Sequence, residues 1–290
     1  MINTKKKEID WPSIGYGTYP QKDTLIDTIP FAIKCGYRLI DVSDNYHNET
    51  YVGQSLRSGM DENTLQELII VSKFSQPYRS GELEKCFEES KEALNKALNV
   101  YLLHWPYPFL WRYQWRKMEE LYQKGKCDAI GVCNFDKNMI KKLLKICKIK
   151  PFVNQIERHP FFQQNEIVEY SKSNGIRIMC YSPVARMDKE MLSNEVLCSL
   201  SHKYNKTISQ IILRWDIQHN DIPIPGSSSE THILENINVF DFSLTDSEVK
   251  MIDSLECGKR IRFDPRKRFT LKEKFRFLAL RIKLRIEGNK

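Results

Sequence analysis

Short apolar runs and longer amphipathic stretches alternate along most of this chain. The short runs are rich in β-branched and aromatic residues and predict strands at Ile14–Thr18, Leu39–Asp41, Leu68–Ser72, Val100–Leu103, Ala129–Val132, Phe152–Ile156, Arg177–Tyr181 and Ile222–Pro225. The stretches between them repeat apolar residues every three or four positions and predict helices near 23–35, 48–58, 82–98, 113–124, 136–147, 164–174, 195–219 and 229–238. Gly125 and Gly175 stand where a helix is expected to end before the next strand.

Eight strand–helix units in a row predict a closed (β/α)8 barrel of the TIM type. The 12 glycines and 12 prolines are spread along the chain, and no low-complexity linker divides it, so we expect a single α/β domain. A doubly wound open sheet is the alternative architecture. That fold would need a Gly-x-Gly-x-x-Gly turn after an early strand to bind a dinucleotide, and the sequence has none.

Ionisable residues follow the second, third and fourth predicted strands. Asp41, Lys73 and His104 each come at or just after the end of a strand, and Tyr46 begins the next helical stretch. In a (β/α)8 barrel the chemistry lies at the carboxyl ends of the strands, so these side chains should meet. An ammonium group beside a tyrosine favours the phenolate and lowers its pKa, a carboxylate holds the lysine, and a histidine can donate to a carbonyl oxygen.

The basic charge of the chain is concentrated at its C-terminus. The whole sequence has 45 Lys and Arg against 37 Asp and Glu, a net charge of +8, whereas residues 258–290 alone carry 13 basic and 3 acidic side chains. The body of the protein is therefore close to neutral. This distribution excludes a general polyanion-binding surface on the body, and we expect no nucleic-acid binding.

The distribution of cysteines and apolar residues predicts a reduced, cytoplasmic protein. The eight cysteines form no Cys-x-x-Cys pair, so neither a metal site nor a disulfide framework is expected. No apolar run is long enough to cross a membrane. Residues 1–7 are basic without a following apolar core and do not look like a signal peptide.

Seven ordered motifs resemble the signature of the aldo-keto reductase family and span roughly residues 13–257. They are Gly36–Asp41 with Tyr46–Glu49 and Val52-Gly53, Ser72-Lys73, Leu102–Pro106, Ile130–Phe135, Asn154–Glu157 with His159-Pro160, Tyr181–Pro183, and Ile224–Ser227 leading to Glu235-Asn236. The resemblance implies an NADPH-dependent carbonyl reductase on a (β/α)8 barrel. We expect residues 1–257 to form this barrel and residues 258–290 to form a C-terminal segment with a basic extension.

The resemblance also assigns roles to individual residues. Tyr46 would donate a proton to the nascent alkoxide, Lys73 would lower the pKa of Tyr46, and Asp41 would pair with Lys73. His104 would orient and polarise the carbonyl, while the hydride would come from C4 of the nicotinamide. Cofactor contacts are implied for Gly17, Thr18, Tyr19, Asp41, Asn134, Gln155, Tyr181, Ser182, Ser227, Ser229, His232, Glu235 and Asn236. Among these, Tyr181 would stack on the nicotinamide, and Asn134 and Gln155 would hold its carboxamide.

Three positions depart from the pattern of the family. Cys133 replaces a common serine, and thiols are weak hydrogen-bond partners. Gly226 and His232 stand where many relatives have lysine and arginine, the cations that bind the 2′-phosphate of NADP. Hydroxyls of the neighbouring serines can still hold that phosphate, so NADP remains the expected cofactor, with NAD as the alternative.

The loop after the fourth strand is short and aromatic, which predicts an open substrate mouth with flat walls. The residues expected to touch a small carbonyl substrate are Tyr19, Trp105, Tyr107, Trp111 and Phe263. Packing of these rings among the helices is the alternative. Two other functions remain open from sequence, namely an NAD-dependent alcohol or sugar dehydrogenase and a cofactor-binding regulatory or scaffold subunit.

The basic extension combines two conflicting patterns. An apolar stripe at Leu271, Phe275, Leu278, Ile282 and Ile286 has helical spacing, whereas residues 280–286 alternate as in a strand. We expect a helix that packs on the barrel with solvated charges. Contact of residues 269–290 with an anionic membrane surface or an acidic partner is the alternative, and the protein is expected to be a monomer.

Overall fold

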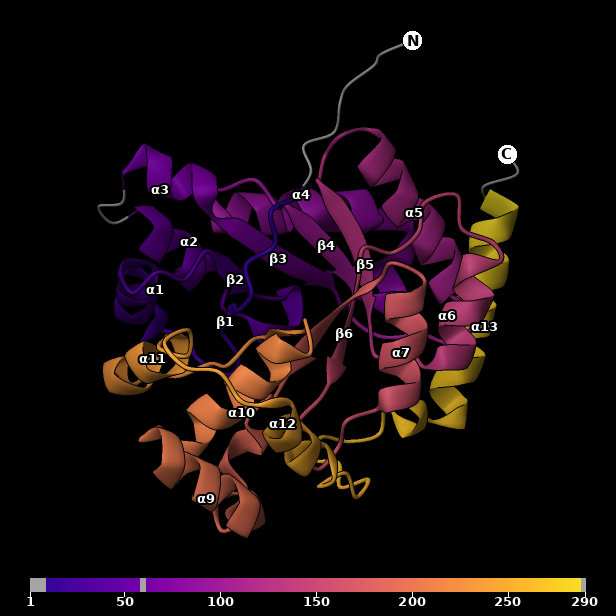
Figure 1. The fold of residues 1–290 in the computed structure, drawn as a ribbon. Coiled ribbons are helices and arrows are strands. Elements are labelled where there is room, and N and C mark those ends of the chain that lie inside the picture. Colours follow the sequence, from indigo (N-terminus) through magenta and orange to yellow (C-terminus); the bar gives the residue numbers. More distant parts are fainter. Residues whose placement is uncertain (1–8, 58–60, 288–290) are drawn as a thin grey trace.

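Eight parallel strands form the centre of the molecule, with helices around them (Figure 1). The structure is a computed structural model that describes residues 9–57 and 61–287. The strands pair in chain order and are β1 (Tyr16–Gly17), β2 (Leu39–Asp41), β3 (Ile69–Phe74), β4 (Val100–Leu103), β5 (Ala129–Cys133), β6 (Val153–Glu157), β7 (Arg177–Tyr181) and β8 (Ile222–Pro223). All eight coincide with predicted strands, so the predicted fold is confirmed.

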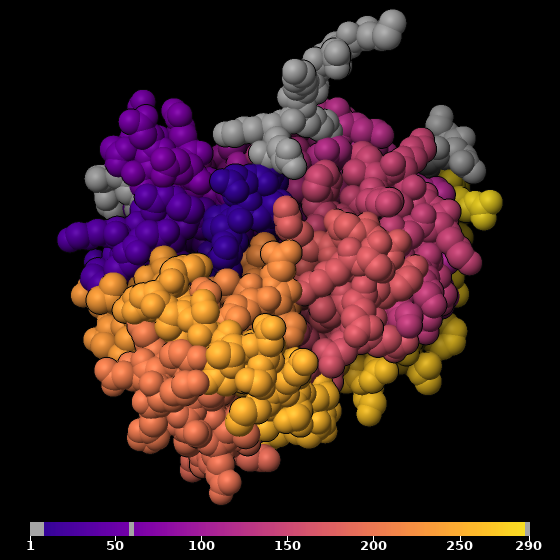
Figure 2. Space-filling view, in the orientation of Figure 1, coloured from indigo at the N-terminus to yellow at the C-terminus, as the bar shows by residue number. Residues whose placement is uncertain are grey.

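Backbone hydrogen bonds join the first and last strands and close the ring. The amide of Gly15 donates to the carbonyl of Pro223 at 2.9 Å, and that of Gly17 donates to the carbonyl of Pro225 at 3.0 Å. The outer layer closes in the same way, because Tyr37 after the first helix donates its hydroxyl to the carbonyl of Ile233 at 3.2 Å. In the space-filling view the first described residues of the barrel, in indigo, therefore lie against the orange residues of the last units (Figure 2).

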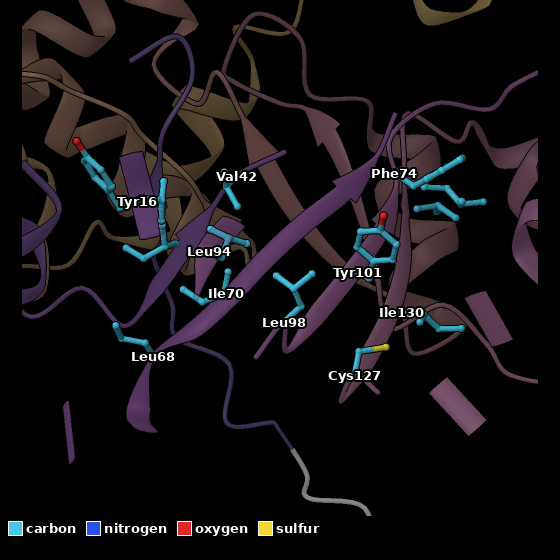
Figure 3. Close-up of a cluster of buried hydrophobic side chains, with 14 of the residues drawn as sticks. Tyr16, Val42, Leu68, Ile70, Phe74, Leu94, Leu98, Tyr101, Cys127 and Ile130 are labelled. Atoms are coloured by element: carbon cyan, nitrogen blue, oxygen red, sulfur yellow. The ribbon is translucent and has the colours of Figure 1, made fainter. Parts of the chain in front are cut away.

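Alternate residues of each strand face the barrel interior and the surrounding helices. Leu39, Val71 and Val100 pack inside the barrel, where Trp11 borders the same cluster. Their sequence neighbours Ile40, Ile70 and Tyr101 belong to the layer between strands and helices, part of which is drawn in Figure 3. The period of two in a strand produces this division, and both faces are apolar because a parallel barrel buries both.

The eight predicted helical stretches all contain helices. These are α1 (Leu25–Lys34), α2 (Glu49–Arg57), α4 (Leu83–Leu94), α5 (Trp111–Gln123), α6 (Lys137–Leu144), α7 (Asn165–Ser173), α9 (Glu195–Tyr204), α10 (Ile208–Gln218) and α11 (Glu230–Ile237). Sequence patterns did not identify α3 (Glu62–Glu67), α8 (Lys189–Leu192) or α12 (Asp246–Asp253). Short 3-10 turns also occur, among them η1 (Asp44–Tyr46), η2 (Pro77–Glu82), η3 (Ala185–Met187) and η4 (Pro265–Lys267).

The single helix predicted over residues 195–219 is wrong, because the chain breaks it between α9 and α10. Asn205 ends α9 in the left-handed conformation, with φ of 51°. Thr207 then starts α10 with a capping box, in which its hydroxyl accepts from the amide of Gln210 and the Gln210 side chain accepts from the Thr207 amide. The apolar period continues through the break, so capping chemistry rather than periodicity marks it.

The basic extension forms a helix, α13 (Leu271–Glu287), but its predicted apolar stripe faces outward. Leu271, Phe275, Ile282 and Ile286 are exposed, whereas Phe277 is only 1% exposed and packs with Leu280 and Leu284. Phe277 meets the rings of Tyr78, Tyr107 and Phe269. These rings form an apolar surface that buries Phe277, so the helix turns the face opposite to the predicted stripe towards the protein.

The cysteines remain unpaired, as predicted, and all eight are free thiols. Four of them, Cys86, Cys127, Cys133 and Cys180, are buried as small apolar side chains. Within the described ranges, none of the helices has the length and apolar character that a bilayer crossing requires. Residues 1–7, for which the sequence predicts no signal peptide, lie outside the described residues, as do the last three of the extension.

Candidate active site

A cavity of about 470 Å³ lies at the carboxyl ends of the barrel strands. The predicted site residues that line it are Gly17, Tyr19, Asp41, Tyr46, His104, Trp105, Asn134, Gln155, Tyr181, Ser182 and Phe263. They come from strand ends that are far apart in sequence, and barrel closure brings them together. The cavity is of the size that binds small organic molecules.

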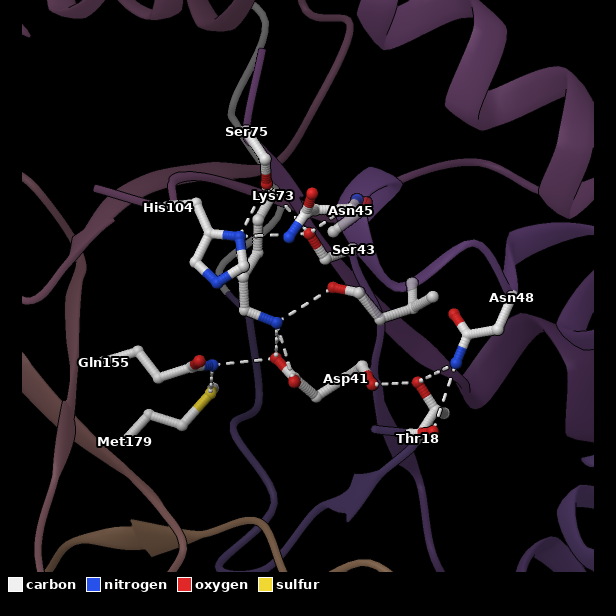
Figure 4. Close-up of polar contacts among 12 residues, drawn as sticks. Thr18, Asp41, Ser43, Asn45, Asn48, Lys73, Ser75, His104, Gln155 and Met179 are labelled. Atoms are coloured by element: carbon white, nitrogen blue, oxygen red, sulfur yellow. Dashed lines mark hydrogen bonds and ion pairs between the residues drawn. The ribbon is translucent and has the colours of Figure 1, made fainter. Parts of the chain in front are cut away.

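A buried ion pair forms the floor of this cavity (Figure 4). The ammonium of Lys73 donates to both carboxylate oxygens of Asp41, at 2.8 and 2.7 Å, and to the carbonyl of Val42 at 2.9 Å. Gln155 donates to the same carboxylate at 2.7 Å. Burial is the largest single effect and would lower the pKa of Lys73, but the attraction and hydrogen bonds of Asp41, together with Tyr46 and Cys133, raise this pKa overall. Lys73 is therefore a fixed positive charge beneath the cavity.

Tyr46 lies over this charge. The ammonium of Lys73 is 4.8 Å from the centre of the Tyr46 ring, and the rings of Tyr19 and His104 flank the tyrosine at 5.0 and 5.8 Å. Burial raises the pKa of Tyr46 to about 12, while Lys73 lowers it and Asp41 raises it further. The predicted lowering by Lys73 is present, but burial outweighs it. Tyr46 is thus a neutral hydroxyl, ready to donate a proton, at neutral pH.

His104 has the opposite shift and remains neutral as well. Burial lowers its pKa well below the ordinary value, and the charges of Lys73 and Arg268 act in the same direction. Its Nδ1 lies 2.6 Å from the hydroxyl of Ser75 and 3.1 Å from that of Ser43. If these hydroxyls donate to Nδ1, the proton of the neutral ring is on Nε2, where it can be donated to a ligand.

Three side chains in the cavity could hold a nicotinamide. The hydroxyl of Tyr181 donates to Oδ1 of Asn134 at 2.8 Å, and Nδ2 of Asn134 donates to the carbonyl of His104 at 3.2 Å. These bonds fix the Tyr181 ring and the Asn134 amide against the cavity, next to the Gln155 amide. A flat ring beside two amides fits a carboxamide-bearing aromatic group. Cys133 is buried in the barrel interior and does not line the cavity.

Gly17 and Gly226 let the ends of the first and last strand units approach each other. A Cβ at Gly226 would lie 2.3 Å from the carbonyl oxygen of Gly17, and a Cβ at Gly17 would lie 2.7 Å from that of Ile224. Close packing against the backbone of Gly17 therefore explains why residue 226 is a glycine. Thr18 is fixed beside them, because its hydroxyl donates to the Asp41 carbonyl at 2.9 Å and Asn48 donates to the threonine.

The residues predicted for the adenosine end lie beyond the cavity lining. Ser227 and Ser229 precede α11, and the hydroxyl of Ser227 accepts from the Ser229 amide at 3.0 Å. His232, Glu235 and Asn236 are on α11, with His232 exposed and Asn236 mostly buried. Ser227, Ser229 and His232 lie at or near the start of α11, where backbone amides favour anions, whereas Glu235 and Asn236 lie in its last turn.

Two of the five predicted substrate contacts lie outside the cavity lining. Tyr107 is 2% exposed and donates its hydroxyl to the carbonyl of Ser75 at 2.7 Å, while its ring packs on Phe269. Trp111 begins α5 and packs on Phe135. Neither lines the cavity. The short loop after β4 turns these rings into the protein, so the alternative of helix-packing aromatics is correct for them.

Sequence reasoning missed several residues of this site. Ser43 and Ser75 hold His104, and they come two and three residues after the predicted strand ends at Asp41 and Ser72, which is the signal that could have identified them. Arg186, Arg262 and Arg268 also line the cavity. Arg262 is adjacent to the predicted contact Phe263, but the sequence does not indicate which basic residues of the C-terminal segment turn inward.

Comparisons with known proteins agree with this geometry. The model of the Aldo/keto reductase family matches residues 11–256. Glyoxal reductase of Bacillus subtilis is 39% identical over 261 residues, which cover 89% of this chain and 93% of the relative. The crystal structure of MGS-M4, an aldo-keto reductase from a Medee basin deep-sea metagenome library, has a TM-score of 0.86 at 31% identity and covers 90% of this chain and 97% of its own. A silkworm (Bombyx mori) aldo-keto reductase complexed with NADPH has a TM-score of 0.81 at 30% identity, with 87% and 86% covered.

Proposed function

Because this chain belongs to the aldo/keto reductase family and is an NADPH-dependent carbonyl reductase, we propose that Tyr46 delivers the proton in the reduction of an aldehyde or ketone to an alcohol. The observation that carries this assignment is the Tyr46 ring above the buried Lys73–Asp41 pair at the floor of the cavity. The dehydrogenase and scaffold alternatives are not favoured, because several relatives are reductases of aldehydes or sugars and the ionisable side chains are assembled at one cavity.

Each residue of the set has a distinct task in this reaction. When bound, NADPH supplies a hydride to the carbonyl carbon. The carbonyl oxygen then becomes an alkoxide, and Tyr46 passes its phenolic proton to that oxygen. The phenolate left on Tyr46 is stabilised by the ammonium of Lys73, which Asp41 holds in place. Because the pKa of Tyr46 is about 12, the proton is available throughout the neutral range.

His104 orients the carbonyl before proton transfer. As a neutral ring it would donate a hydrogen bond from Nε2–H to the carbonyl oxygen. This bond would polarise the carbonyl and stabilise the negative charge that develops on its oxygen. Tyr181, Asn134 and Gln155 would hold the nicotinamide end of the cofactor, with backbone at Gly17, Thr18 and Ser182 beside it. The adenosine end would be held by Ser227, Ser229, His232, Glu235 and Asn236.

Replacement of Tyr46 by phenylalanine tests the proton donor. We expect Tyr46→Phe to reduce kcat at least 100-fold, because it removes a single hydroxyl and leaves the ring contacts with Tyr19 and His104. The rate is followed by NADPH absorbance with an aldehyde, and quenching of protein fluorescence by NADPH serves as the control for folding and cofactor binding. Unchanged turnover would show that another group delivers the proton.

The outward face of α13 supports a second proposal, contact with an anionic lipid surface. Leu271, Phe275, Ile282 and Ile286 are 54–73% exposed and recur at helical spacing. Lys272, Arg276 and Lys283 stand on one side of this stripe, and Lys274 and Arg285 stand on the other. An exposed apolar stripe between two basic rows fits a membrane interface, where the stripe enters the headgroup layer and each cation attracts anionic lipid.

Vesicle co-sedimentation distinguishes an anionic lipid surface from an acidic protein as the binding partner of the outward face of α13. We expect the protein to pellet with phosphatidylserine–phosphatidylcholine vesicles and to pellet far less with phosphatidylcholine alone. Phe275→Ser with Ile282→Ser should abolish binding, as should Arg276→Gln with Lys283→Gln. Equal binding to both vesicles, or binding that survives these substitutions, would overturn the lipid proposal. So would capture by a polyglutamate peptide without vesicle binding, which would indicate an acidic protein partner.

We further propose that the enzyme acts as a cytoplasmic monomer that does not bind nucleic acid. The near-neutral charge of residues 1–257 and the eight free thiols support this proposal. Sedimentation of the purified protein over a range of concentrations tests its oligomeric state.

A further inference from the structure

Two arginines of the C-terminal segment face the cavity without a carboxylate partner. Of the four arginines in residues 258–268, Arg260 pairs with Glu157 at 3.2 Å and Arg266 pairs with Asp264 at 2.8 Å. Arg262 and Arg268 line the cavity, and no acidic side chain lies within ion-pair distance of either among residues 9–57 and 61–287. The unpaired cations are therefore the ones that a ligand would meet.

Each of these arginines lies on an aromatic ring that contacts a residue of the proton-transfer set. The guanidinium carbon of Arg268 is 4.2 Å from the centre of the Trp105 ring, and Trp105 stacks on His104 at 5.0 Å. The guanidinium carbon of Arg262 is 5.6 Å from the ring of Tyr19, which contacts Tyr46 at 5.0 Å. One ring thus separates each cation from a group that would touch the carbonyl oxygen.

The cavity wall does not neutralise this charge. The only acidic side chain in the described lining is Asp41, and its carboxylate is occupied by Lys73 and Gln155. Arg186 adds a third positive charge on the Ser182 side. Arginine stays charged at all relevant pH values, so the mouth is positive while the floor is balanced.

The backbone around Arg262 is held in place before any substrate binds. The buried carboxylate of Glu157 accepts hydrogen bonds from the amides of Ile261 at 2.6 Å and Arg262 at 2.9 Å. Further along, Pro265 at the start of η4 and Phe269 directly after Arg268 are both buried, and they anchor the chain on either side of Arg268. Anchoring of this kind reduces the ordering cost of binding, which is the main advantage of a pre-organised site.

We propose that this mouth selects carbonyl compounds that carry a second, anionic group, a carboxylate or a phosphate ester. The inference rests on the proposed function, with the carbonyl at Tyr46 and His104. The anionic group would lie between Arg262 and Arg268, whose planar forks pair with two oxygens of either anion. Trp105 and Phe263, whose ring centres are 5.2 Å apart, would border the apolar part of the molecule.

Matched substrate pairs test this selection with the full chain and NADPH. We expect kcat/KM to be about tenfold or more higher for 4-carboxybenzaldehyde than for benzaldehyde, from the strength of charged hydrogen bonds. The same comparison of glyceraldehyde 3-phosphate with glyceraldehyde tests the phosphate group. The larger of the two kcat/KM ratios shows which anion is preferred. Arg262→Gln and Arg268→Gln should lower the anionic-to-neutral ratio mainly through KM. Arg266→Gln, whose arginine is paired outside the cavity, is the control that should leave the ratio unchanged.

The outcomes separate this inference from the proposed function. Reduction of both members of each pair with equal kcat/KM would overturn the anion selection and leave the carbonyl reductase assignment intact. Absence of NADPH oxidation with every aldehyde would overturn the assignment itself. If Arg262→Gln or Arg268→Gln raises the KM for NADPH and leaves the substrate ratio unchanged, these arginines bind the cofactor and the proposal is wrong.

Discussion

His104 is buried and Tyr46 is half-buried, and the loss of hydration shifts their pKa values in opposite directions. A phenolate costs more to bury than a phenol, so the pKa of Tyr46 rises to about 12, whereas an imidazolium costs more to bury than an imidazole, so the pKa of His104 falls. Both residues are therefore neutral at pH 7, and each can offer a proton to a carbonyl oxygen. The proposed reduction requires that Tyr46 carries its proton.

The lowered pKa of His104 predicts a pH-dependent contribution to stability. Below the ordinary value of 6.5 the unfolded chain protonates this histidine while the folded protein does not, so the free energy of unfolding falls as the pH drops below that value. The slope from this residue is at most about 1.4 kcal/mol per pH unit. We expect His104→Gln to remove this part of the slope between pH 6.5 and 5. Urea unfolding at several pH values measures it, and identical slopes in the two proteins would contradict the prediction.

We propose that the hydroxyl of Ser75 donates to Nδ1 of His104 and so leaves the ring proton on Nε2. It lies 2.6 Å from Nδ1, closer than that of Ser43 at 3.1 Å. We expect Ser75→Ala to lower kcat about tenfold with little change in KM for NADPH, because the Nε2–H tautomer loses its nearer partner. Ser43→Ala is the matched variant and should have a smaller effect. A larger loss in Ser43→Ala than in Ser75→Ala would reverse the assignment.

At the scale of elements, the structure differs from the sequence patterns where helices begin and end. The long helix predicted at 195–219 divides at Asn205–Thr207, and α4 stops at Leu94 because Asn95 adopts the left-handed conformation, with φ of 49°. The helical spacing of apolar residues is a property of several turns, whereas the position at which a helix ends depends on one or two capping residues. Strands were predicted more accurately, because burial on both faces makes them continuous apolar runs.

The orientation of α13 gives a prediction at this scale. Phe277 is 1% exposed among three aromatic rings, whereas Phe275 on the same helix is 69% exposed. We expect Phe277→Ala to lower the free energy of unfolding by about 3–5 kcal/mol, since it leaves a large cavity under the helix. Phe275→Ala should change it by less than about 0.5 kcal/mol. Denaturant unfolding compares the two, and equal effects would mean that the helix presents its other face.

At the scale of the whole molecule, barrel closure and the C-terminal segment assemble the site. Asp41 and Gln155 are 114 positions apart, yet they share a hydrogen bond of 2.7 Å at the floor of the cavity. The segment after α12 then crosses the mouth and adds Arg262, Phe263 and Arg268. The positive charge that appears in the sequence as a tail property is thus divided between the substrate mouth and the outer surface of α13.

The sequence by itself determined the barrel and the order of its strands, and it predicted that Asp41, Tyr46, Lys73 and His104 would meet at one end of it. It could do so because strand period, turn residues and the ordered motifs are local in the chain. Only the tertiary structure decided which face of α13 is buried, that Tyr107 and Trp111 turn away from the cavity, and that Arg262 and Arg268 turn towards it. These outcomes depend on which surfaces meet across the molecule, and burial among distant neighbours also set the pKa of Tyr46 above its ordinary value despite the adjacent lysine.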